Sequence, residues 1–407
     1  MKILWLSHFT PYPDTGFGAL QRSRGLLQGI AEHHEVSLIT LTRGLDIHDA
    51  HLFEQARTDL ERFCECVIFA APDESRCFPS QAAVLLRSAI RNRPYSVELF
   101  RSRQMTDAVS LLLSRERFDL VHADTLGLVE DLLPSIRCPV VLNHHNVESS
   151  MMRRRASLQT NALKKAFFSW EAAKLESYER TYGPRFALHV AVSGDDASEI
   201  ATFAGKAPVV IVENPVDCDY WKPRSGVPFN REMLFVGGMD WYPNRDAVIY
   251  FCREIFPEVR RKYPDARLTV VGRVPDGGID LGDASAGVTF TGFVDDVREY
   301  FHRARVFVCP MRDGGGTKLK VVNAFASGIP VVSTRFGASG LECQDGAQLL
   351  LAETPEEFAA QISRAFEDSD LCLKLQTTAR QFVCERYSTK GLAERLSVEY
   401  AKVKQPN

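Results

Sequence analysis

The sequence predicts an α/β protein with two lobes, each built on a parallel sheet that is covered by helices on both faces. Short apolar runs rich in β-branched residues alternate with helical stretches along the whole 407-residue chain. The apolar runs are continuous rather than alternating, which is typical of parallel strands buried on both faces. Thirteen such runs would make a single sheet too wide, so we expect two Rossmann-like lobes of similar size.

The first seven strands come before residue 220, with helical patterns between them, for example at 19–34 and 106–118. The expected strands are residues 2–7, 36–41, 66–70, 120–123, 140–145, 187–193 and 209–214. A polar stretch with proline and glycine, residues 218–232, precedes the eighth strand. Such a stretch is typical of a linker, so the sequence predicts lobes of residues 1–220 and 221–407.

The second half of the chain repeats the alternation of strand and helix. Its expected strands are residues 233–238, 267–273, 288–294, 306–310, 329–334 and 347–352. Two helices, 371–386 and 389–404, end the chain with no strand after them. The pattern leaves open whether these terminal helices pack back on the first lobe.

Composition excludes several classes of protein. A 45% share of hydrophobic and a 25% share of charged residues exclude disordered and collagen-like chains. The net charge of −3 excludes nucleic acid as an expected partner. No apolar run reaches the about 18 residues needed to cross a bilayer, and the start, MKILWLSHFTPYP, resembles a strand rather than a signal peptide. The ten cysteines form no CxxC pair, which disfavours zinc, disulfides and secretion; we expect a cytoplasmic protein.

A glycine-rich turn stands between the strand at 306–310 and a predicted helix from Thr317 to Ala326. Its glycines are Gly314, Gly315 and Gly316. Glycines allow a ligand to approach the backbone closely, and the free N–H groups of a helix start favour an anion. Thr317 is expected to cap the helix, and Lys318 and Lys320 add positive charge. We expect a phosphate or pyrophosphate here; the alternative is a tight turn that uses glycine for its own geometry.

A second glycine loop, with Gly16 and Gly18, follows the first strand and precedes the helix at 19–33. It is not a GxGxxG motif, because position 21 is Gln21, and no acidic residue ends the second strand. A dinucleotide cofactor is therefore disfavoured. The loop still lies at the carboxyl end of a strand, where open α/β sheets bind ligands.

A third polar segment, residues 143–150, directly follows the strand at 140–145. It contains Asn143, His144, His145, Asn146 and Glu148. Neighbouring side chains of an extended segment point to opposite sides, so one of the two histidines is expected to face the crevice. A metal site is disfavoured because the segment has neither HExxH spacing nor an apparent third ligand. A structural role in binding loop carbonyls is the alternative.

Residues 151–165 carry five basic residues and no acidic one, and open a long predicted helix from Met151 to Gly183. The basic residues are Arg153, Arg154, Arg155, Lys164 and Lys165, and the aromatic residues Phe167, Phe168 and Trp170 follow. An earlier stretch, Arg76–Arg103, has six arginines against Glu98. Basic and aromatic residues together suit an anionic membrane or a phosphorylated acceptor. The alternative is a solvated helix face whose aromatic side chains pack into the lobe.

Taken in order, these segments resemble a retaining glycosyltransferase of family 4 with the GT-B fold, in which two Rossmann-like lobes flank a cleft. The similar motifs are the PYPxxxG loop, HNVES, AVS before an acidic helix start, ENPVD, FVGGMDWYPN, the strand end VGR, TGFVDDV and GGGTKLK. The resemblance spans nearly the whole chain. It is nearest to the sugar transferases of bacterial exopolysaccharide systems.

The resemblance implies an enzyme that moves a sugar, with retention, from a nucleoside diphosphate-sugar to a lipid-linked or polysaccharide acceptor. It implies no bound metal and no other cofactor, since dipoles and cations stabilise the leaving diphosphate. The first lobe would hold the acceptor and the second the donor. Such an enzyme would lie in the cytoplasm, with peripheral attachment to the inner face of the plasma membrane as an option.

The resemblance also assigns residues. His145 would be catalytic, approaching the sugar or acceptor. Main chain at Gly292–Val294 would contact the base, and the Gly16–Gly18 loop would close on the phosphates. The expected donor-binding residues are Gly16, Gly18, Arg273, Gly292, Phe293, Val294, Gly314, Gly315, Gly316, Thr317, Lys318, Lys320 and Asn323. Arg153, Arg154 and Arg155 would lie on the acceptor or membrane side.

The chain departs from the family pattern at two places. The Glu-x7-Glu motif falls on Gly315 and Asn323, so both carboxylates are absent. The usual Arg and Lys after the first strand of the second lobe fall on Gly238 and Asn244. Lys318 and Lys320 are expected to supply the missing positive charge, with Arg245 and Arg273 in reserve.

These departures leave two alternatives open. One is a donor-binding or partner-binding protein of the same fold with degraded catalysis. The other is an epimerase or phosphorylase, although only Glu148 and Asp240 are acidic candidates for an epimerase and no lysine motif for pyridoxal phosphate is present.

Overall fold

The computed structural model describes residues 1–12, 18–43, 50–73, 78–223, 226, 228–314 and 317–404. The chain forms two compact units, Met1–Glu213 with Leu392–Asn407, and Asn214–Gly391. The sequence predicts a boundary after residue 220, whereas the first unit of the structure ends at Glu213. The reason is local: Val216 forms a β-bridge with Ser388, and Trp221 is buried in the core of the second unit.

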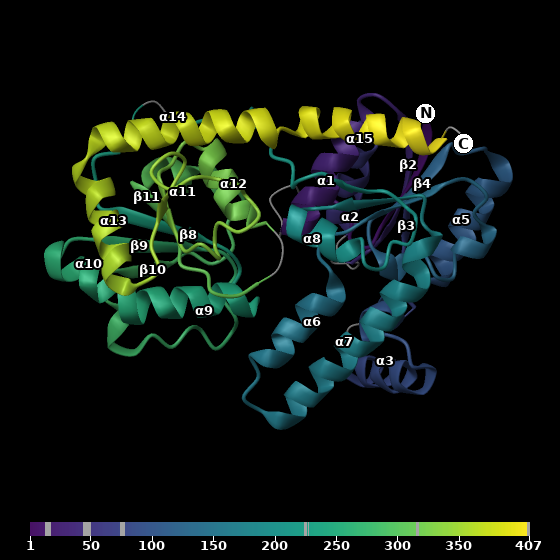
Figure 1. The fold of residues 1–407 in the computed structure, drawn as a ribbon, viewed down its shortest axis with the longest axis horizontal. Helices are drawn as coiled ribbons and strands as arrows, with labels where there is room; N and C mark the ends of the chain where they lie inside the picture. The colour runs from purple at the N-terminus through teal and green to yellow at the C-terminus, as the bar shows by residue number, and fades with distance from the viewer. Residues whose placement is uncertain are drawn as a thin grey trace. The chain divides into compact units, whose positions relative to one another are not determined.

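The first unit has a seven-stranded parallel sheet (Figure 1). Its strands are β1 (Lys2–Ser7), β2 (Glu35–Leu41), β3 (Cys66–Ala70), β4 (Leu120–Ala123), β5 (Val140–Asn143), β6 (Leu188–Ala191) and β7 (Val209–Ile211). Their order is β3-β2-β1-β4-β5-β6-β7, and Ile3 of β1 pairs with both Val36 and Leu120. Every strand expected in this half of the chain is present, and the predicted parallel sheet is confirmed.

Helices cover both faces of this sheet. They are α1 (Gly18–Ala31), α2 (Ala50–Leu60), α3 (Phe78–Arg91), α4 (Tyr95–Phe100), α5 (Arg103–Arg115), α6 (Glu148–Ser157), α7 (Ala162–Tyr182), α8 (Gly194–Ile200) and α15 (Thr389–Lys404). The last terminal helix, α15, packs on the first unit: Leu396 and Tyr400 are buried in the same core cluster as Trp5. Tyr400 Oη also forms a hydrogen bond with His122 Nδ1, 2.5 Å away.

The long helix expected from Met151 is interrupted, which corrects the sequence prediction. Helix α6 ends at Ser157 and α7 begins at Ala162. Asn161 stops the continuity, because its side chain accepts a hydrogen bond from Lys164 N at 3.0 Å and caps the second helix. The two segments therefore form a helical hairpin.

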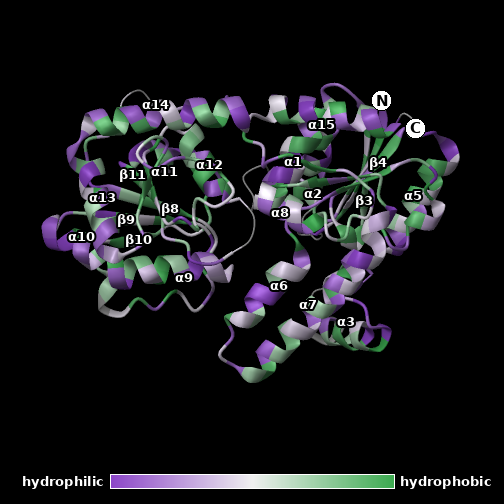
Figure 2. Ribbon diagram, viewed as in Figure 1, coloured by the Kyte–Doolittle hydropathy of each residue, from purple (hydrophilic) through white to green (hydrophobic). Residues whose placement is uncertain are grey.

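The second unit has a six-stranded parallel sheet in the order β10-β9-β8-β11-β12-β13. Its strands are β8 (Glu232–Val236), β9 (Arg267–Val271), β10 (Val288–Phe290), β11 (Val306–Cys309), β12 (Val331–Ser333) and β13 (Leu350–Leu351). The helices are α9 (Tyr242–Tyr250), α10 (Phe256–Lys262), α11 (Arg298–Arg303), α12 (Leu319–Ala326), α13 (Pro355–Glu367) and α14 (Ser369–Arg386). Phe235, Phe307 and Phe325 are buried at the centre of the core, and Figure 2 shows hydrophobic strands in both sheets.

Strand order determines where each unit can bind a ligand. The chain builds one side of the sheet first and then crosses to the other, so the order switches between β1 and β4 and between β8 and β11. Open α/β sheets bind ligands at the carboxyl ends of the strands at such a switch.

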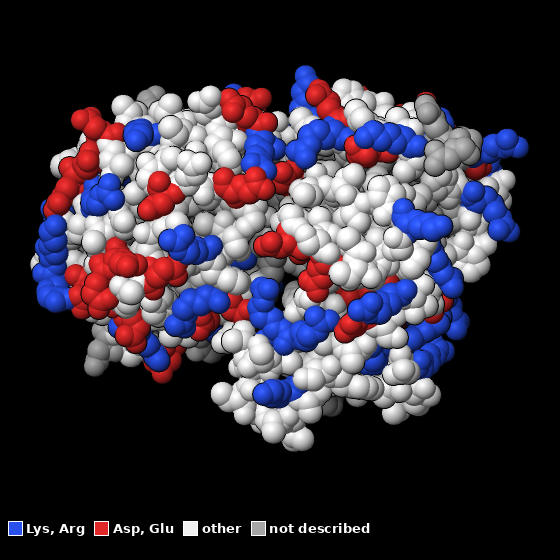
Figure 3. Space-filling model, in the orientation of Figure 1, with Lys and Arg blue, Asp and Glu red and all other residues white. Residues whose placement is uncertain are grey.

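Acidic and basic side chains are interspersed over most of the visible surface of the protein (Figure 3). Of the helices that the structure describes, none is both long and apolar enough to cross a membrane.

Candidate active site

The first unit gathers three titratable side chains at the carboxyl edge of its sheet. His8 follows β1, Asp124 follows β4, and His145 lies just after β5. His145 Nε2 is 3.1 Å from Asp124 Oδ1, and His8 Nδ1 is 3.9 Å from Asp124 Oδ2. The cluster therefore lies at the switch point that the strand order defines.

Asp124 is the centre of this cluster, and it is completely buried. Asn143 Nδ2 donates to Asp124 Oδ1 at 2.6 Å, Ser7 Oγ donates to Oδ2 at 3.3 Å, and Ser23 Oγ donates to the same oxygen. Burial alone would raise the pKa of Asp124, but its interactions with the imidazoles of His145, His8 and His122 outweigh burial and hold that pKa well below its ordinary value. Asp124 is therefore a carboxylate at neutral pH.

The two adjacent histidines point in different directions, as the extended backbone requires. His144 Nε2 lies 2.9 Å from His189 Nδ1, and His189 Nε2 donates to the carbonyl of Gly183 at 3.0 Å. His144 is thus held in the interior, away from Asp124. His145 is the histidine at the carboxyl edge of the sheet.

A half-buried carboxylate flanks this group. Glu148, the first residue of α6, accepts hydrogen bonds from Thr125 Oγ1 at 3.0 Å and Ser96 Oγ at 3.2 Å. Its burial raises the pKa of Glu148. Arg22 Nη2 donates to Asn143 Oδ1 at 2.7 Å, which joins α1 to the same network.

His8, Asp124 and His145 are also the group of described residues that could hold a metal ion, since their ligand atoms lie within 4.8 Å of one another. Burial lowers the pKa of His8 to about 3, so the ring is neutral at pH 7, the form that binds metals. His8 and Asp124 are not among the site residues that the sequence predicts. Both are polar residues directly after the two strands that flank the switch point, and that position was the available signal.

In the second unit, Lys320 and Asn244 meet at the carboxyl end of β8. Lys320 Nζ, from α12, donates a hydrogen bond to Asn244 Oδ1, and Asn244 Nδ2 donates to the carbonyl of Gly238 at 2.9 Å. Burial, together with the nearby charge of Lys318, lowers the pKa of Lys320 to about 8. Lys320 is thus a partly desolvated ammonium group at the second switch point.

Gly237 makes room for this pair. A Cβ at this position would lie 2.5 Å from Asn244 Nδ2 and 2.9 Å from Lys320 Nζ. The same strand end is joined to its neighbours through the backbone: Gly272 N donates to the carbonyl of Gly292 at 3.1 Å, and Met239 N to that of Arg273 at 2.7 Å. The main chain of Gly292 and Arg273 therefore lies at the edge that carries Lys320.

The turn before α12 differs from the prediction. Helix α12 begins at Leu319, and Lys318, whose backbone is extended (φ −81°, ψ 90°), is its N-cap residue. The expected cap by Thr317 is wrong, since the extended Lys318 places Thr317 before the cap position. Thr317 Oγ1 is buried and makes no hydrogen bond to the residues that the structure describes. Lys318 is buried too, with its Nζ 4.6 Å from the centre of the Phe336 ring.

The remaining predicted residues are distributed as follows. Gly16, Gly315 and Gly316 lie outside the described residues. Gly18 is the first residue of α1, and Gly314 lies in the turn before α12. Asn323 is a half-buried residue of α12. The side chains of Arg273 and Phe293 are exposed and that of Val294 is half-buried, whereas Arg153, Arg154 and Arg155 are exposed on α6.

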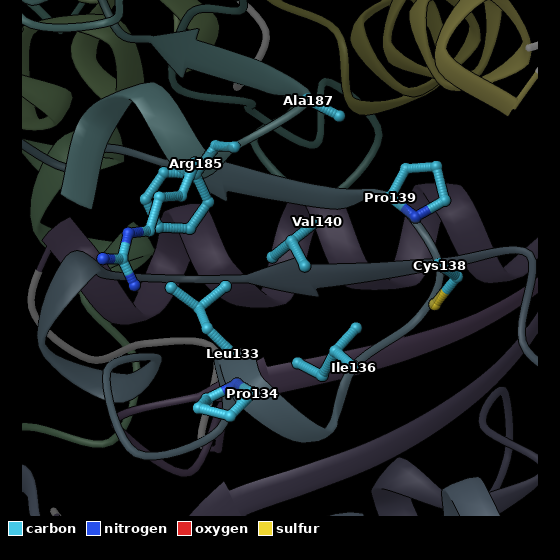
Figure 4. Close-up of a pocket in the computed structure, with 9 residues that line it drawn as sticks. Leu133, Pro134, Ile136, Cys138, Pro139, Val140, Arg185 and Ala187 are labelled. Carbon is cyan, nitrogen blue, oxygen red and sulfur yellow. The ribbon is translucent and has the colours of Figure 1, made fainter.

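A pocket of the first unit lies at the opposite edge of its sheet (Figure 4). It is lined by Leu133, Pro134, Ile136, Cys138, Pro139, Val140, Arg185, Phe186 and Ala187. Val140 is the first residue of β5, so the pocket is at the amino ends of the strands, away from the edge that carries His145. None of the predicted site residues lines it.

Two parallel α/β units with polar clusters at their switch points are the architecture of the GT-B enzymes, and comparison with known proteins agrees. The model of Glycosyltransferase Family 4 matches residues 24–220, and that of Glycosyl transferases group 1 matches residues 230–368. The chain is a glycosyltransferase with the GT-B fold.

Two relatives and a solved structure illustrate the likeness. An uncharacterised 44.6 kDa protein in the cps region of Klebsiella pneumoniae is 23% identical over 401 residues, 96% of this chain and 97% of its own. The putative glycosyltransferase YtcC of Bacillus subtilis is 24% identical over 328 residues, 74% of this chain and 76% of its own. HepE of Anabaena, solved in complex with UDP-glucose, superimposes with a TM-score of 0.66 at 16% identity, covering 99% of this chain and 100% of HepE.

Proposed function

We propose that this chain transfers a sugar, with retention of configuration, from a nucleoside diphosphate-sugar to a lipid-linked or polysaccharide acceptor. The observation that carries the donor assignment is the placement of Lys320, Lys318 and Thr317 together at the switch point of the second unit. A UDP-sugar is the first donor to test, because HepE was solved with UDP-glucose. The relative from a cps region supports an exopolysaccharide acceptor.

Each of these groups favours a diphosphate. Lys320 is partly desolvated, and an anion beside it would restore the stability of its charged form. The buried hydroxyl of Thr317 offers a donor that the described protein does not use. The start of α12 adds unpaired N–H groups and a partial positive charge. Together they would stabilise the negative charge that develops on the leaving diphosphate.

The cluster of the first unit supplies a group for the sugar or the acceptor. In a neutral ring, the contact of His145 Nε2 with the Asp124 carboxylate places the proton on Nε2 and leaves Nδ1 as an acceptor. Within the described part of the chain neither ring nitrogen of His145 has a hydrogen-bond partner, so Nε2 meets Asp124 as a close charge contact and Nδ1 is available to a ligand. We assign Nδ1 to a hydroxyl of the substrate, and Asp124 to positioning the ring.

The proposed chemistry needs no metal, because Lys318 and Lys320 would neutralise the leaving group. Retention would follow from attack on the face that the diphosphate leaves. The anomeric configuration of the product, read by NMR against that of the donor, tests this part of the proposal. An inverted product would contradict it.

The first experiment measures the melting temperature with UDP, GDP, ADP and CMP. A ligand at a hundredfold excess over its dissociation constant adds about 2.7 kcal/mol, a shift of a few degrees for a chain of this size. We expect UDP to give the largest shift, and then a panel of UDP-sugars identifies the donor. If none of the nucleotides raises the melting temperature, the donor assignment is wrong and a degraded partner-binding protein is favoured.

A further inference from the structure

Exposed apolar side chains gather on one part of the first unit. On α3, Leu86 is 63% exposed and Ile90 is 76% exposed, and on the first turn of α7 Leu163 is 83% exposed. Leu85, Leu158 and Trp170 are also exposed in the same elements. We call the exposed faces of α3, the end of α6 and the first half of α7 the hairpin surface. Large apolar side chains left in water in this number mark a surface that something covers.

The elements of this surface are fixed to one another. Lys174 Nζ of α7 donates to Ser88 Oγ of α3 at 2.7 Å and to the carbonyl of Arg93 at 3.0 Å. Ser88 and Val84 are completely buried, so α3 turns one face toward the protein and presents Leu86 and Ile90 to solvent. The apolar residues of α3 and α7 thus belong to one rigid part of the unit.

The same surface is basic. Residues 78–91 and 149–170 contain no acidic residue. Arg154, Arg155, Lys164 and Lys165 are exposed there. In Figure 3 the tip of this region, where α6 and α7 meet in Figure 1, shows uncharged and basic atoms.

Some of the basic and aromatic residues from which the sequence predicts a membrane surface are paired or half-buried in the structure. Arg153 is paired with Glu176 at 3.1 Å, and Arg87 of α3 lies 3.2 Å from the buried Glu98. Phe167 and Phe168 are half-buried and pack edge to face. The exposed features of the surface are the basic side chains of Arg154, Arg155, Lys164 and Lys165 and the aliphatic side chains of Leu86, Ile90 and Leu163.

We propose that the hairpin surface docks on an anionic lipid bilayer, with its aliphatic side chains inserted between headgroups and its basic side chains on lipid phosphates. Only such a partner offers apolar depth and negative charge together. A second copy of this chain related by a twofold axis would bring like charges face to face. Nucleic acid would leave Leu86, Ile90 and Leu163 without an apolar partner.

The test is cosedimentation of the full chain with vesicles of phosphatidylcholine alone, or of equal parts phosphatidylcholine and phosphatidylglycerol. We expect binding to the anionic vesicles only, weakened by salt. Leu86→Ser/Ile90→Ser/Leu163→Ser should weaken it about tenfold or more, as should glutamine at Arg154, Arg155, Lys164 and Lys165. Matched controls are Leu111→Ser/Leu373→Ser/Val398→Ser and glutamine at Lys206, Lys222, Lys374 and Lys390, all exposed elsewhere.

Several results would overturn the proposal. One is equal sedimentation with neutral and anionic vesicles, and another is equal loss in the controls. A third is a dimer in analytical ultracentrifugation that the serine triple variant converts to monomer while vesicle binding stays unchanged. The melting shift with a nucleotide, measured on the same samples, reports folding and donor binding. It therefore separates failure of this proposal from failure of the proposed sugar transfer.

Discussion

The imidazole of His145 is anchored to Asp124 by a 3.1 Å contact between Nε2 and Oδ1. The two residues differ in burial and in the number of hydrogen bonds that they make to the rest of the protein. Asp124 is completely buried and accepts hydrogen bonds from three further side chains, on β1, α1 and β5. His145 lies at the edge of the same cluster and is slightly exposed. We therefore expect substitution of His145 to reduce activity alone, and substitution of Asp124 to reduce both activity and stability.

His145→Ala should reduce sugar transfer about a hundredfold or more, because it removes a group placed to accept a proton or hydrogen bond from the substrate. Asp124 keeps its other three donors, so the melting temperature should change by only a few degrees, and the nucleotide-induced shift should persist. Steady-state kinetics and thermal melting check this. Transfer at the wild-type rate would show that His145 is not the catalytic residue.

Asp124→Asn should reduce both transfer and stability. The amide group of an asparagine would face the donating amide of Asn143, and His145 would lose its charged partner. Breaking a buried charge network costs about 3–5 kcal/mol, so we expect a clear fall in melting temperature. Asp107→Asn, at an exposed position on α5, is the matched control. An Asp124→Asn protein that melts and reacts like the wild type would contradict the central role of Asp124.

Donor affinity should depend on pH through Lys320. Its pKa is lowered to about 8 by burial in the free protein, and a bound diphosphate would raise it. The affinity for the donor is then highest below pH 8 and falls as the pH rises above 8, because the neutral amine of Lys320 must first take up a proton to bind the diphosphate. Titration calorimetry between pH 7 and 9 measures this.

Lys320→Met separates the lysine from other titrating groups. It should weaken nucleotide binding roughly tenfold or more and remove the pH dependence, since a hydrogen bond to a charged group contributes about 1.5–3 kcal/mol. The melting temperature of the variant should be no lower than that of the wild type, because methionine removes a charged group whose desolvation destabilises the folded protein. Lys374→Met, at an exposed site on α14, should change neither property. A pH profile that survives in Lys320→Met would assign the titration elsewhere.

Asn323→Glu should tighten nucleotide binding about tenfold if position 323 meets the ribose. A carboxylate accepts a stronger hydrogen bond than an amide, by about 1 kcal/mol or more. Asn323→Gln, which lengthens the side chain without adding charge, is the control. Unchanged affinity in Asn323→Glu would mean that this residue of α12 does not face the ribose.

The sequence predicts the two sheets well, because strands buried on both faces carry a continuous apolar pattern that survives without context. Contacts between residues that are far apart in the sequence could not be predicted in this way. Asp124 meets His145 only because β1, β4 and β5 are neighbours, and Lys320 meets Asn244 only because α12 follows β11 beside β8. No local pattern encodes these pairings. The break at Asn161 was missed because its flanking residues favour helix on both sides.

Metal removal should leave sugar transfer unchanged. The proposed leaving-group stabilisation uses Lys318 and Lys320 rather than a divalent ion. Dialysis against a strong chelator, followed by assays with and without added Mg²⁺, Mn²⁺ or Zn²⁺, checks this. Loss of transfer that one metal restores would contradict it. His8→Ala would then test whether His8, Asp124 and His145 form the binding site, since their ligand atoms lie within 4.8 Å.

The first unit should be the more acid-sensitive of the two. Burial lowers the pKa of His122 to about 3 and that of His189 to about 4, and it lowers the pKa of His144 well below its ordinary value. In the unfolded chain these rings titrate near 6.5. The unfolded state therefore binds more protons below that pH, so stability is full above pH 6.5 and is lost as the pH falls toward 4.

The second unit has only His302 among the ten histidines of the chain, and this half-buried ring donates a hydrogen bond from Nε2 to the carbonyl of Lys222 at 2.9 Å. Hydrogen exchange at pH 7.5 and pH 5 should therefore show loss of protection in the first unit before the second. His189→Gln should reduce the effect, because glutamine can still donate to the Gly183 carbonyl and accept from His144 but does not titrate. His33→Gln, at an exposed position, should leave it unchanged. Equal loss of protection in both units would place the acid-sensitive groups elsewhere.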